Sequence, residues 1–210
     1  GHFASAETRR RLKLDWKRPF LLLLRIGDRP AILLPGASFF LFQLGFLIYY
    51  TFILVEMQGS YGFSTAELGL FSMVMGIGCA ISSAWGFRTL RGRFASDKPV
   101  TLIGLALCGL FVAASALPIP AAGQVALAFL STFSNIFAFI TLLTAISSSV
   151  DESERGWALG VANAGVALSV FVAGLLTSLL TLFSSDVFLL LGGLIVLTSL
   201  LPAMRMRVAG

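Results

Sequence analysis

Six long apolar segments dominate this sequence, and they restrict the fold more than any other feature. Each has about 20 residues or more, enough for a helix to cross a hydrocarbon core of about 30 Å. In lipid only helices and closed barrels pair all their backbone groups, and these segments are too long for barrel strands. We therefore expect an all-α membrane protein with transmembrane helices at 31–57, 65–90, 99–119, 124–150, 156–183 and 186–204.

The fifteen Lys and Arg residues are confined to alternate gaps between these segments. The gaps around 58–64, 120–122 and 184–186 contain no cation. Short loops rich in Lys and Arg stay on the cytoplasmic side of a membrane, which places both termini in the cytoplasm. In chain order the cations are Arg9, Arg10, Arg11, Lys13, Lys17, Arg18, Arg25 and Arg29, then Arg88, Arg91, Arg93 and Lys98, then Arg155, and finally Arg205 and Arg207.

The same pattern divides the chain into three parts. Residues 1–30 form a basic cytoplasmic segment, residues 31–204 the six-helix domain, and residues 205–210 a cytoplasmic tail. Within the first part, the apolar stretch at 20–24 is too short to span a bilayer and is predicted to lie along its surface. A chain that starts with Gly1 and a basic stretch suggests a fragment of a longer protein.

Composition excludes several classes of protein. With 57% hydrophobic and 12% charged residues and a mean hydropathy of +0.93, the sequence does not resemble a soluble domain. The net positive charge lies at membrane flanks without interleaved aromatic residues, so we expect no nucleic-acid partner. The single histidine, His2, precedes the helices, and no nucleophile and base are placed for catalysis. We therefore expect neither an enzyme nor a bound metal or cofactor.

Local signals predict where some helices begin. Ser64 with Glu67 has the spacing of a capping box for the second helix. Asp151 with Glu154 places an acceptor and an acid at the start of the fifth, and Asp186 is a similar candidate for the sixth. Pro35 is expected to bend or delay the first helix.

One loop carries a family resemblance. Between the fourth and fifth segments, Arg155, Gly156, Ala158 and Gly160 form the pattern Arg-Gly-x-Ala-x-Gly at the start of a Gly- and Ala-rich helix. This pattern resembles the loop before the penultimate helix in transporters of the major facilitator superfamily. Those proteins have two six-helix halves, and the resemblance identifies this chain with the C-terminal half.

Three further stretches fit that placement. Residues 86–93 (GFRTLRGR) are similar to the second-half copy of the family's Gly-x-x-x-Asp-Arg-x-Gly-Arg-Arg loop, without its acidic residue. Residues 61–69 (YGFSTAELG) resemble a loop of the drug and proton antiporter branch, and the basic N-terminus resembles the end of the central loop. The resemblance covers residues 19–204 and implies two inverted three-helix repeats, with an N-terminal six-helix half as partner.

The few polar residues inside the segments are the candidates for a binding site, since buried polar groups in membranes are often functional. In the family, the first and fourth helices of each half line the central cavity. Interhelical hydrogen bonding is the alternative for Gln43, Tyr50 and Asn135. The resemblance and spacing together give the following candidate cavity residues: Gln43, Tyr49, Tyr50, Ser134, Asn135, Thr141 and Asn163.

Other residues are candidates for coupling, gating and packing. Glu56 is an acid near the outer membrane edge, as is Glu67, and each either exchanges protons or marks a helix end. Gly156 and Gly160 belong to a small-residue stripe that permits close helix packing. The predicted cytoplasmic gate combines the basic loop after the second helix with the charged loop before the fifth, either as conformation-dependent ion pairs or as solvated charges. Its residues are Arg88, Arg91, Arg93, Asp151, Glu154 and Arg155.

We therefore expect half of a secondary transporter that works by alternating access in the bacterial inner membrane, with protons as the coupling ion. An apolar cavity with few charges suits a hydrophobic or amphiphilic substrate, and favours export of drug-like compounds. The alternative is a self-contained six-helix channel, or a half-size carrier that functions as a homodimer.

Overall fold

The computed structural model describes residues 30–206, and every regular element in that range is a helix. Six helical stretches are long and apolar enough to cross a membrane, which confirms the predicted all-α, multi-pass architecture. The elements are α3 (Pro30–Gly59), α4 (Thr65–Ile81), a π-helical turn (Ser82–Gly86), α5 (Phe87–Arg91), α6 (Asp97–Ala114), α7 (Ala121–Ser148), a 3₁₀ turn (Glu152–Glu154), α8 (Arg155–Leu176), a 3₁₀ turn (Thr177–Thr181), α9 (Ser185–Thr198) and α10 (Leu200–Arg205). The predicted surface stretch at 20–24 lies outside the described residues.

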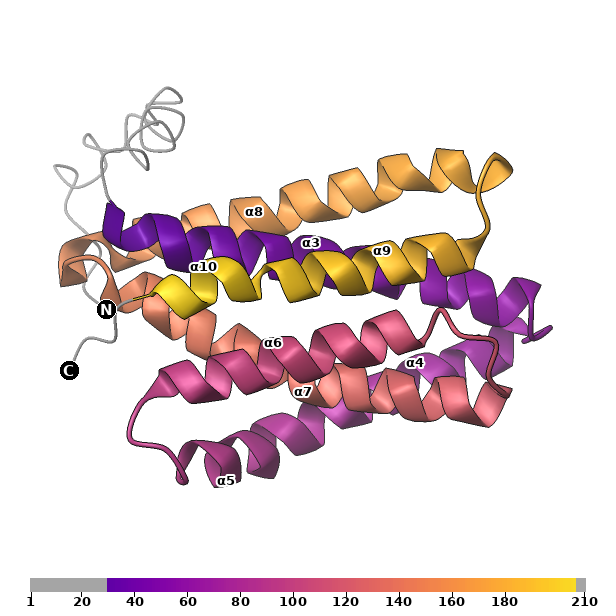
Figure 1. Ribbon diagram of the computed structural model, residues 1–210, viewed down its shortest axis with the longest axis horizontal. Coiled ribbons are helices and arrows are strands. Elements are labelled where there is room, and N and C mark those ends of the chain that lie inside the picture. The colour runs from indigo at the N-terminus through magenta and orange to yellow at the C-terminus, as the bar shows by residue number, and fades with distance from the viewer. Residues whose placement is uncertain (1–29, 207–210) are drawn as a thin grey trace, which may run out of the picture.

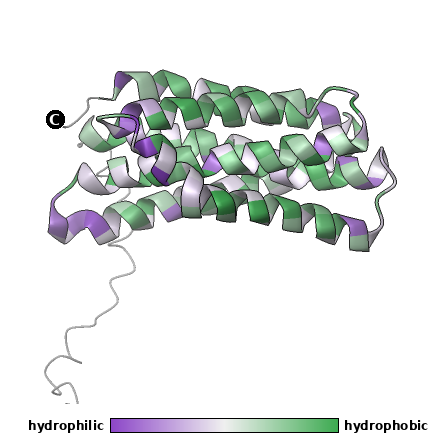
Figure 2. Cartoon of the chain, turned by 90° about the horizontal axis from the view of Figure 1, so that it is seen from below, coloured by the Kyte–Doolittle hydropathy of each residue, from purple (hydrophilic) through white to green (hydrophobic). Residues whose placement is uncertain are grey.

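The six spans run side by side with their connections alternating between two ends (Figure 1). The α3–α4, α6–α7 and α8–α9 connections meet at one end, which we call the cation-free end. The start of α3, the α5–α6 and α7–α8 connections and the end of α10 meet at the other, the basic end. Figure 2 shows hydrophilic residues gathered toward the ends and hydrophobic residues along the helices, as a bilayer requires.

Two helices form the centre of the bundle. α3 packs against α8 and α9, α7 packs against α4 and α6, and α3 and α7 also contact each other. In the most apolar window of each span, 44% of α3 and 50% of α7 is buried, against 22% of the α4 span and 17% of the α8 span. α4 and α8 are therefore the two least enclosed helices.

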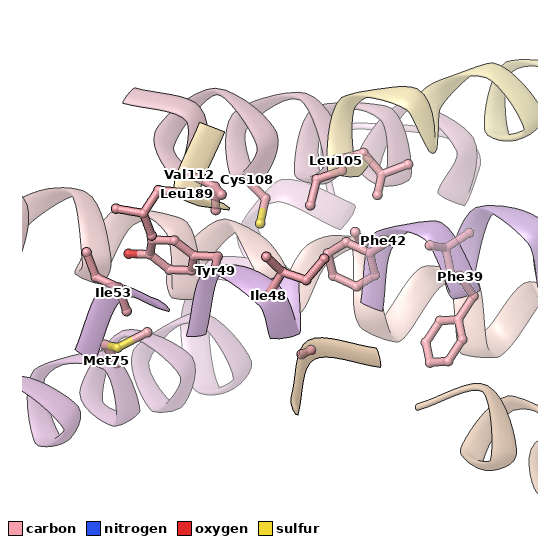
Figure 3. Packing of buried hydrophobic residues seen from close by; sticks show 14 of the residues in the cluster. Phe39, Phe42, Ile48, Tyr49, Ile53, Met75, Leu105, Cys108, Val112 and Leu189 are labelled. Carbon is pink, nitrogen blue, oxygen red and sulfur yellow. The ribbon is translucent and has the colours of Figure 1, made fainter. Parts of the chain in front are cut away.

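Large side chains of α3 make much of the interior. Phe39, Phe42 and Tyr49 are buried along this helix, and Phe52 stacks on Phe188 of α9 with ring centroids 4.2 Å apart. Figure 3 shows this row of α3 side chains with Leu105, Cys108 and Val112 of α6 on one side. Without water between helices, such close packing is the main force holding them together.

Glycines set the closest helix approaches. A Cβ on Gly45 of α3 would lie 2.5 Å from the carbonyl oxygen of Gly192 in α9, and a Cβ on Gly104 of α6 would lie 2.6 Å from the backbone nitrogen of Ala138 in α7. Gly104 and Gly192 each lie seven residues after their helix begins. Both contacts are thus close approaches of a glycine to a neighbouring backbone, and both lie at the same distance from the start of α6 or α9.

Helix starts agree with only some local predictions. The capping box at Ser64 and Glu67 is confirmed: the Glu67 backbone N–H donates to Ser64 Oγ, and the Ser64 N–H donates to Glu67 Oε2 at 2.8 Å. The predicted cap at Asp151 is wrong, because a 3₁₀ turn separates it from α8 and its side chain makes no capping hydrogen bond. Pro35 does not delay α3, which starts before it at Pro30 and continues through it.

Some predicted boundaries shift for local reasons. The third span ends as an α-helix at Ala114, not at residue 119, because Pro118 disfavours helical geometry in the residue before it and lacks a donor. The fifth is α-helical to Leu176 and continues as a 3₁₀ turn. In the sixth, α9 and α10 are separated at Ser199, where Pro202 cannot donate to the carbonyl of residue 198.

Candidate functional site

The predicted cavity residues fall into two groups in the structure. Five are buried on α3 and α7, whereas Tyr50 and Asn163 are exposed on α3 and α8. Tyr49 has no exposed surface at all. Whether these residues line a substrate cavity stays a prediction. The buried five are Gln43, Tyr49, Ser134, Asn135 and Thr141.

Most hydroxyls of α7 bond first to their own helix. Ser131 Oγ donates to the carbonyl of Ala128, Ser134 Oγ to that of Leu130 at 2.7 Å, and Thr141 Oγ1 to that of Phe137. These contacts pair the hydroxyl donors within the apolar span. The stripe of small polar residues on α7 is therefore compatible with lipid depth without any ligand.

A few hydroxyls also join neighbouring helices. Thr101 Oγ1 of α6 donates to Thr141 Oγ1 of α7 at 2.8 Å, and Ser38 Oγ of α3 donates to the carbonyl of Ser199 at 2.9 Å. Ser82 Oγ, in the π-helical turn, donates to the Phe133 carbonyl at 2.6 Å. Such bonds stabilise membrane helix pairs by about 0.6 kcal/mol on average. The interhelical alternative therefore has direct examples in this fold.

Two buried amides retain an unpaired atom. Asn135 Nδ2 and Gln124 Oε1 have no hydrogen-bond partner among residues 30–206, although Gln124 Nε2 donates to the Ser115 carbonyl at 2.8 Å. A buried polar atom without a partner costs about 1–3 kcal/mol and calls for an explanation. Asn135 lies midway along α7, which places this unpaired amide nitrogen in the bundle interior.

The two acids near the cation-free end make local contacts. The Ser185 hydroxyl in the first turn of α9 donates to the Glu56 carboxylate of α3, and Glu67 is held by Ser64 in the capping box. Carboxylates near a helix N-terminus are favoured by its dipole. Glu67 thus marks a helix start, while Glu56 links α3 to α9. A role for Glu56 in proton coupling stays a prediction.

The predicted gate residues all lie at the basic end, but the contacts differ from those expected. Arg91 pairs with Asp97, and its Nη1 donates to the Phe94 carbonyl at 2.8 Å. In the described part of the chain, Arg155 forms no ion pair with Asp151. In this conformation the Arg91–Asp97 ion pair lies within the α5–α6 connection and does not join it to the α7–α8 connection.

Lys98 is a functional candidate that the sequence reasoning missed. Its Nζ donates to the carbonyls of Met204 at 2.7 Å and Met206 at 2.8 Å, which joins the first turn of α6 to the end of α10. A cation beside the last carbonyls of a helix pairs acceptors that the helix itself leaves free. The partners are 106 and 108 residues away in sequence, so no local pattern could have indicated this contact.

A cavity of about 1050 Å³ opens between α3, α6, α7 and α10 at the basic end. Of the predicted site residues, Arg91 and Thr141 line it. Because its walls come from segments far apart in sequence, spacing alone could not reveal it. The lining residues are Ala31, Leu34, Pro35, Arg91, Ala95, Ser96, Asp97, Lys98, Thr101, Thr141, Thr144, Ala145, Ser148, Ser149, Arg205 and Met206.

The predicted packing glycines of α8 face open space. A Cβ added to Gly156 or Gly160 would meet nothing within 4 Å. Close glycine contacts are found instead on other helices, among them those of Gly45, Gly104 and Gly192. Packing at Gly156 and Gly160 therefore requires a partner beyond this bundle, and it stays a prediction.

Within residues 30–206 no three His, Cys, Asp or Glu side chains lie close enough together to hold a metal ion. Comparison with known protein families finds no family that matches the chain, and comparison with curated proteins finds no relative.

Proposed function

We propose that this chain is one six-helix half of a secondary transporter similar to the major facilitator superfamily. It consists of two inverted three-helix repeats, α3 to α6 and α7 to α10, with both termini in the cytoplasm. Transport occurs by alternating access, as this half rocks against an N-terminal half that carries six further helices.

The observation that carries this proposal is a two-fold symmetry in the helix contacts. The symmetry pairs α3 with α7, α4 with α8, and α6 with α9. Under this exchange the α3–α8 contact becomes the α7–α4 contact, and the α3–α9 contact becomes the α7–α6 contact. The α3–α7 and α6–α9 contacts map onto themselves. The Gly104 and Gly192 contacts exchange in the same way. Two repeats of opposite orientation, related by a two-fold axis, account for all of these pairs.

The least enclosed helices support the need for a second half. α4 and α8 are related by the same exchange, and both present glycines with open space beside them, including Gly69, Gly76 and Gly160. Small residues allow helices of another unit to approach closely. Tyr50 and Asn163 are polar groups exposed on α3 and α8, so a partner half seated there would enclose them.

The interior chemistry favours an apolar or amphiphilic substrate. The described acids and cations all lie at or near helix ends, and the buried polar groups between them are amides and hydroxyls. A neutral interior binds hydrophobic compounds in preference to phosphates or sugar acids. We further propose proton-coupled export across a bacterial inner membrane, with the proton carried by Glu56 or by an acid of the N-terminal half.

Flux measurements test the proposal directly. The chain alone, the N-terminal half alone, and the two expressed together are reconstituted into liposomes, and uptake of a fluorescent amphiphile is followed under a proton gradient. We expect transport when both halves are present and none from this chain by itself. Gradient-dependent flux from the 210-residue chain alone would instead identify a self-contained channel or a homodimeric carrier.

Cysteine labelling tests the orientation. In a background of Cys79→Ala and Cys108→Ala, a single cysteine is placed at exposed Ser60 or exposed Asp151, at opposite ends of the bundle. A membrane-impermeant maleimide added to intact cells should label Ser60→Cys, and should label Asp151→Cys only after the membrane is opened. The reverse pattern would place the termini outside.

A further inference from the structure

The cavity at the basic end combines charge, hydroxyl groups and apolar walls. Leu34 and Pro35 of α3 and Ala145 of α7 supply apolar surface, while Thr101 and Thr144 supply hydroxyls. The cations come from three separate helices, with Arg91 in α5, Lys98 in α6 and Arg205 in α10. Such a site is amphiphilic, with a polar, charged part and an apolar part.

The cavity has a surplus of positive charge. Residues 30–206 contain six Lys and Arg side chains, and three of them line this cavity. The lining has one carboxylate, that of Asp97, which leaves a net charge of +2. Asp97 pairs with Arg91, so the charges of Lys98 and Arg205 are not balanced by an acid in the lining. Low-dielectric walls strengthen the attraction of such a site for anions.

Each of the three cations also has N–H donors that make no hydrogen bond within the described chain. Lys98 Nζ uses two of its three protons on the Met204 and Met206 carbonyls. Arg91 bonds through Nε and Nη1, and a guanidinium has five N–H donors. Arg205 makes no hydrogen bond or ion pair within the described chain. An anion with several acceptor oxygens could bind these donors without breaking the contacts that hold α6 to α10.

We propose that this cavity binds the phosphate headgroup of an anionic lipid from the leaflet at the basic end. A phosphate has acceptor oxygens for the lysine and arginine donors, as charge-assisted hydrogen bonds require. A volume of about 1050 Å³ is far larger than a free phosphate needs, and cavities of this size hold whole drug-sized molecules. The apolar wall next to the cations matches the start of an acyl chain, and the position at the helix ends is where lipid headgroups lie. This inference requires membrane insertion but does not depend on the transport proposal.

The experiment measures lipid retention by native mass spectrometry on the purified chain in phosphatidylcholine nanodiscs. Phosphatidate is added in one arm, more phosphatidylcholine in a second, and phosphatidate with excess inorganic phosphate in a third. The variants are Arg205→Gln, Arg205→Lys and Arg93→Gln, of which the last is a matched control because Arg93 is a cation of the same end that does not line the cavity. Arg205→Lys tests whether any loss follows the charge instead of a folding defect.

We expect selective retention of phosphatidate by the unmodified chain, by Arg205→Lys and by Arg93→Gln. Arg205→Gln should weaken phosphatidate retention about tenfold, as loss of one charge-assisted hydrogen bond predicts. Equal retention by Arg205→Gln and Arg93→Gln would overturn the proposal. So would equal retention of phosphatidylcholine, and so would displacement of phosphatidate by inorganic phosphate, which would identify a free phosphate as the ligand.

Discussion

The central helices α3 and α7 and the outer helices α4 and α8 have similar apolar sequences but different environments. The mean hydropathy of all four spans lies between 1.6 and 2.0. The buried share of α3 and of α7 is nevertheless at least twice that of α4 or α8. In a membrane, apolar surface can face lipid or protein at similar cost, so hydropathy does not determine which helix is central. The contacts that a helix makes determine its position.

The space beside individual glycines illustrates this difference between the central and outer helices. A Cβ added to Gly45 in α3 would meet the backbone of α9, whereas a Cβ added to Gly76 in α4 or Gly160 in α8 would meet nothing within 4 Å. On α4 itself, Gly78 differs from Gly76, since its Cβ would lie 2.9 Å from the Phe129 carbonyl oxygen of α7. The same residue type therefore permits contact in one place and leaves open surface in another. The comparison indicates that the outer pair is either lipid-facing or reserved for a partner, and the following experiments distinguish buried from open positions.

The largest effect is expected from Gly45→Ala. The new methyl group would lie 2.5 Å from the Gly192 carbonyl oxygen and 2.8 Å from the Val196 backbone nitrogen, so the two helices must separate. We expect a loss of about 1–3 kcal/mol in the free energy of unfolding. Denaturant titration in mixed micelles measures it. The matched control is Gly76→Ala on α4, which should be neutral or slightly stabilising because alanine favours helix. Equal losses for both variants would contradict the comparison.

A smaller effect is expected at the start of α4, where a local cap replaces packing. Ser64→Ala removes the Ser64 hydroxyl, which accepts from the Glu67 backbone N–H and donates to the Glu67 carboxylate, and should cost about 1 kcal/mol. The bond from the Ser64 backbone N–H to Glu67 remains. Hydrogen exchange of the first turn of α4 should rise more than exchange in α3. Ser60→Ala, in the same loop, serves as the control, since its side chain makes no hydrogen bond among the described residues. No change in exchange for Ser64→Ala would show that packing, not the cap, holds this end.

The interhelical hydroxyl pair should contribute less again. Thr141→Val removes the bond with Thr101 and should destabilise the bundle by about 0.6 kcal/mol. Thr144→Val is the matched control one turn away, because the Thr144 hydroxyl is exposed and donates to the carbonyl of Ile140 in its own helix. The same mixed-micelle titration compares them. If Thr144→Val lowers the free energy of unfolding as much as Thr141→Val does, the Thr101–Thr141 bond does not stabilise the bundle specifically.

The smallest effect on the chain itself is expected from Gly160→Leu on α8. Nothing occupies the space beside this glycine, so the free energy of unfolding of the 210-residue chain should change by less than about 0.5 kcal/mol. In the proposed assembly with an N-terminal half, the same variant should lower transport strongly, because leucine would block close approach of the partner. Unchanged flux in the two-half assembly would place this face of α8 against lipid.

The sequence was sufficient for features that depend on neighbouring residues. Apolar length gave the spans to within a few residues at most ends, and the Ser64 and Glu67 spacing gave a cap that the structure confirms. The sequence-based predictions were wrong where the backbone geometry of a turn or a proline outweighed the local composition. Pro118 ended α6 early despite an apolar run, and Asp151 did not cap α8 because a 3₁₀ turn intervenes.

The candidate site shows the same division. Hydrophobicity and polarity predicted that Gln43, Asn135 and Thr141 lie within spans, and all three are buried. Two contacts depend on helices brought together from distant positions: the bond of Thr141 with Thr101, and the bonds of Lys98 to the Met204 and Met206 carbonyls. Spacing along one helix carries no information about which helix lies beside it.

By itself, the sequence determined that this protein has six apolar spans and that its cations lie in alternate gaps, because both follow from the cost of placing polar and charged groups in lipid. Only the tertiary structure decided that α3 and α7 are central, that Gly45 and Gly104 are contact points while Gly160 is not, and that Arg91, Lys98 and Arg205 share one cavity. The physical reason is that lipid distinguishes apolar from polar residues but not one apolar helix from another, so shape complementarity between helices makes that choice.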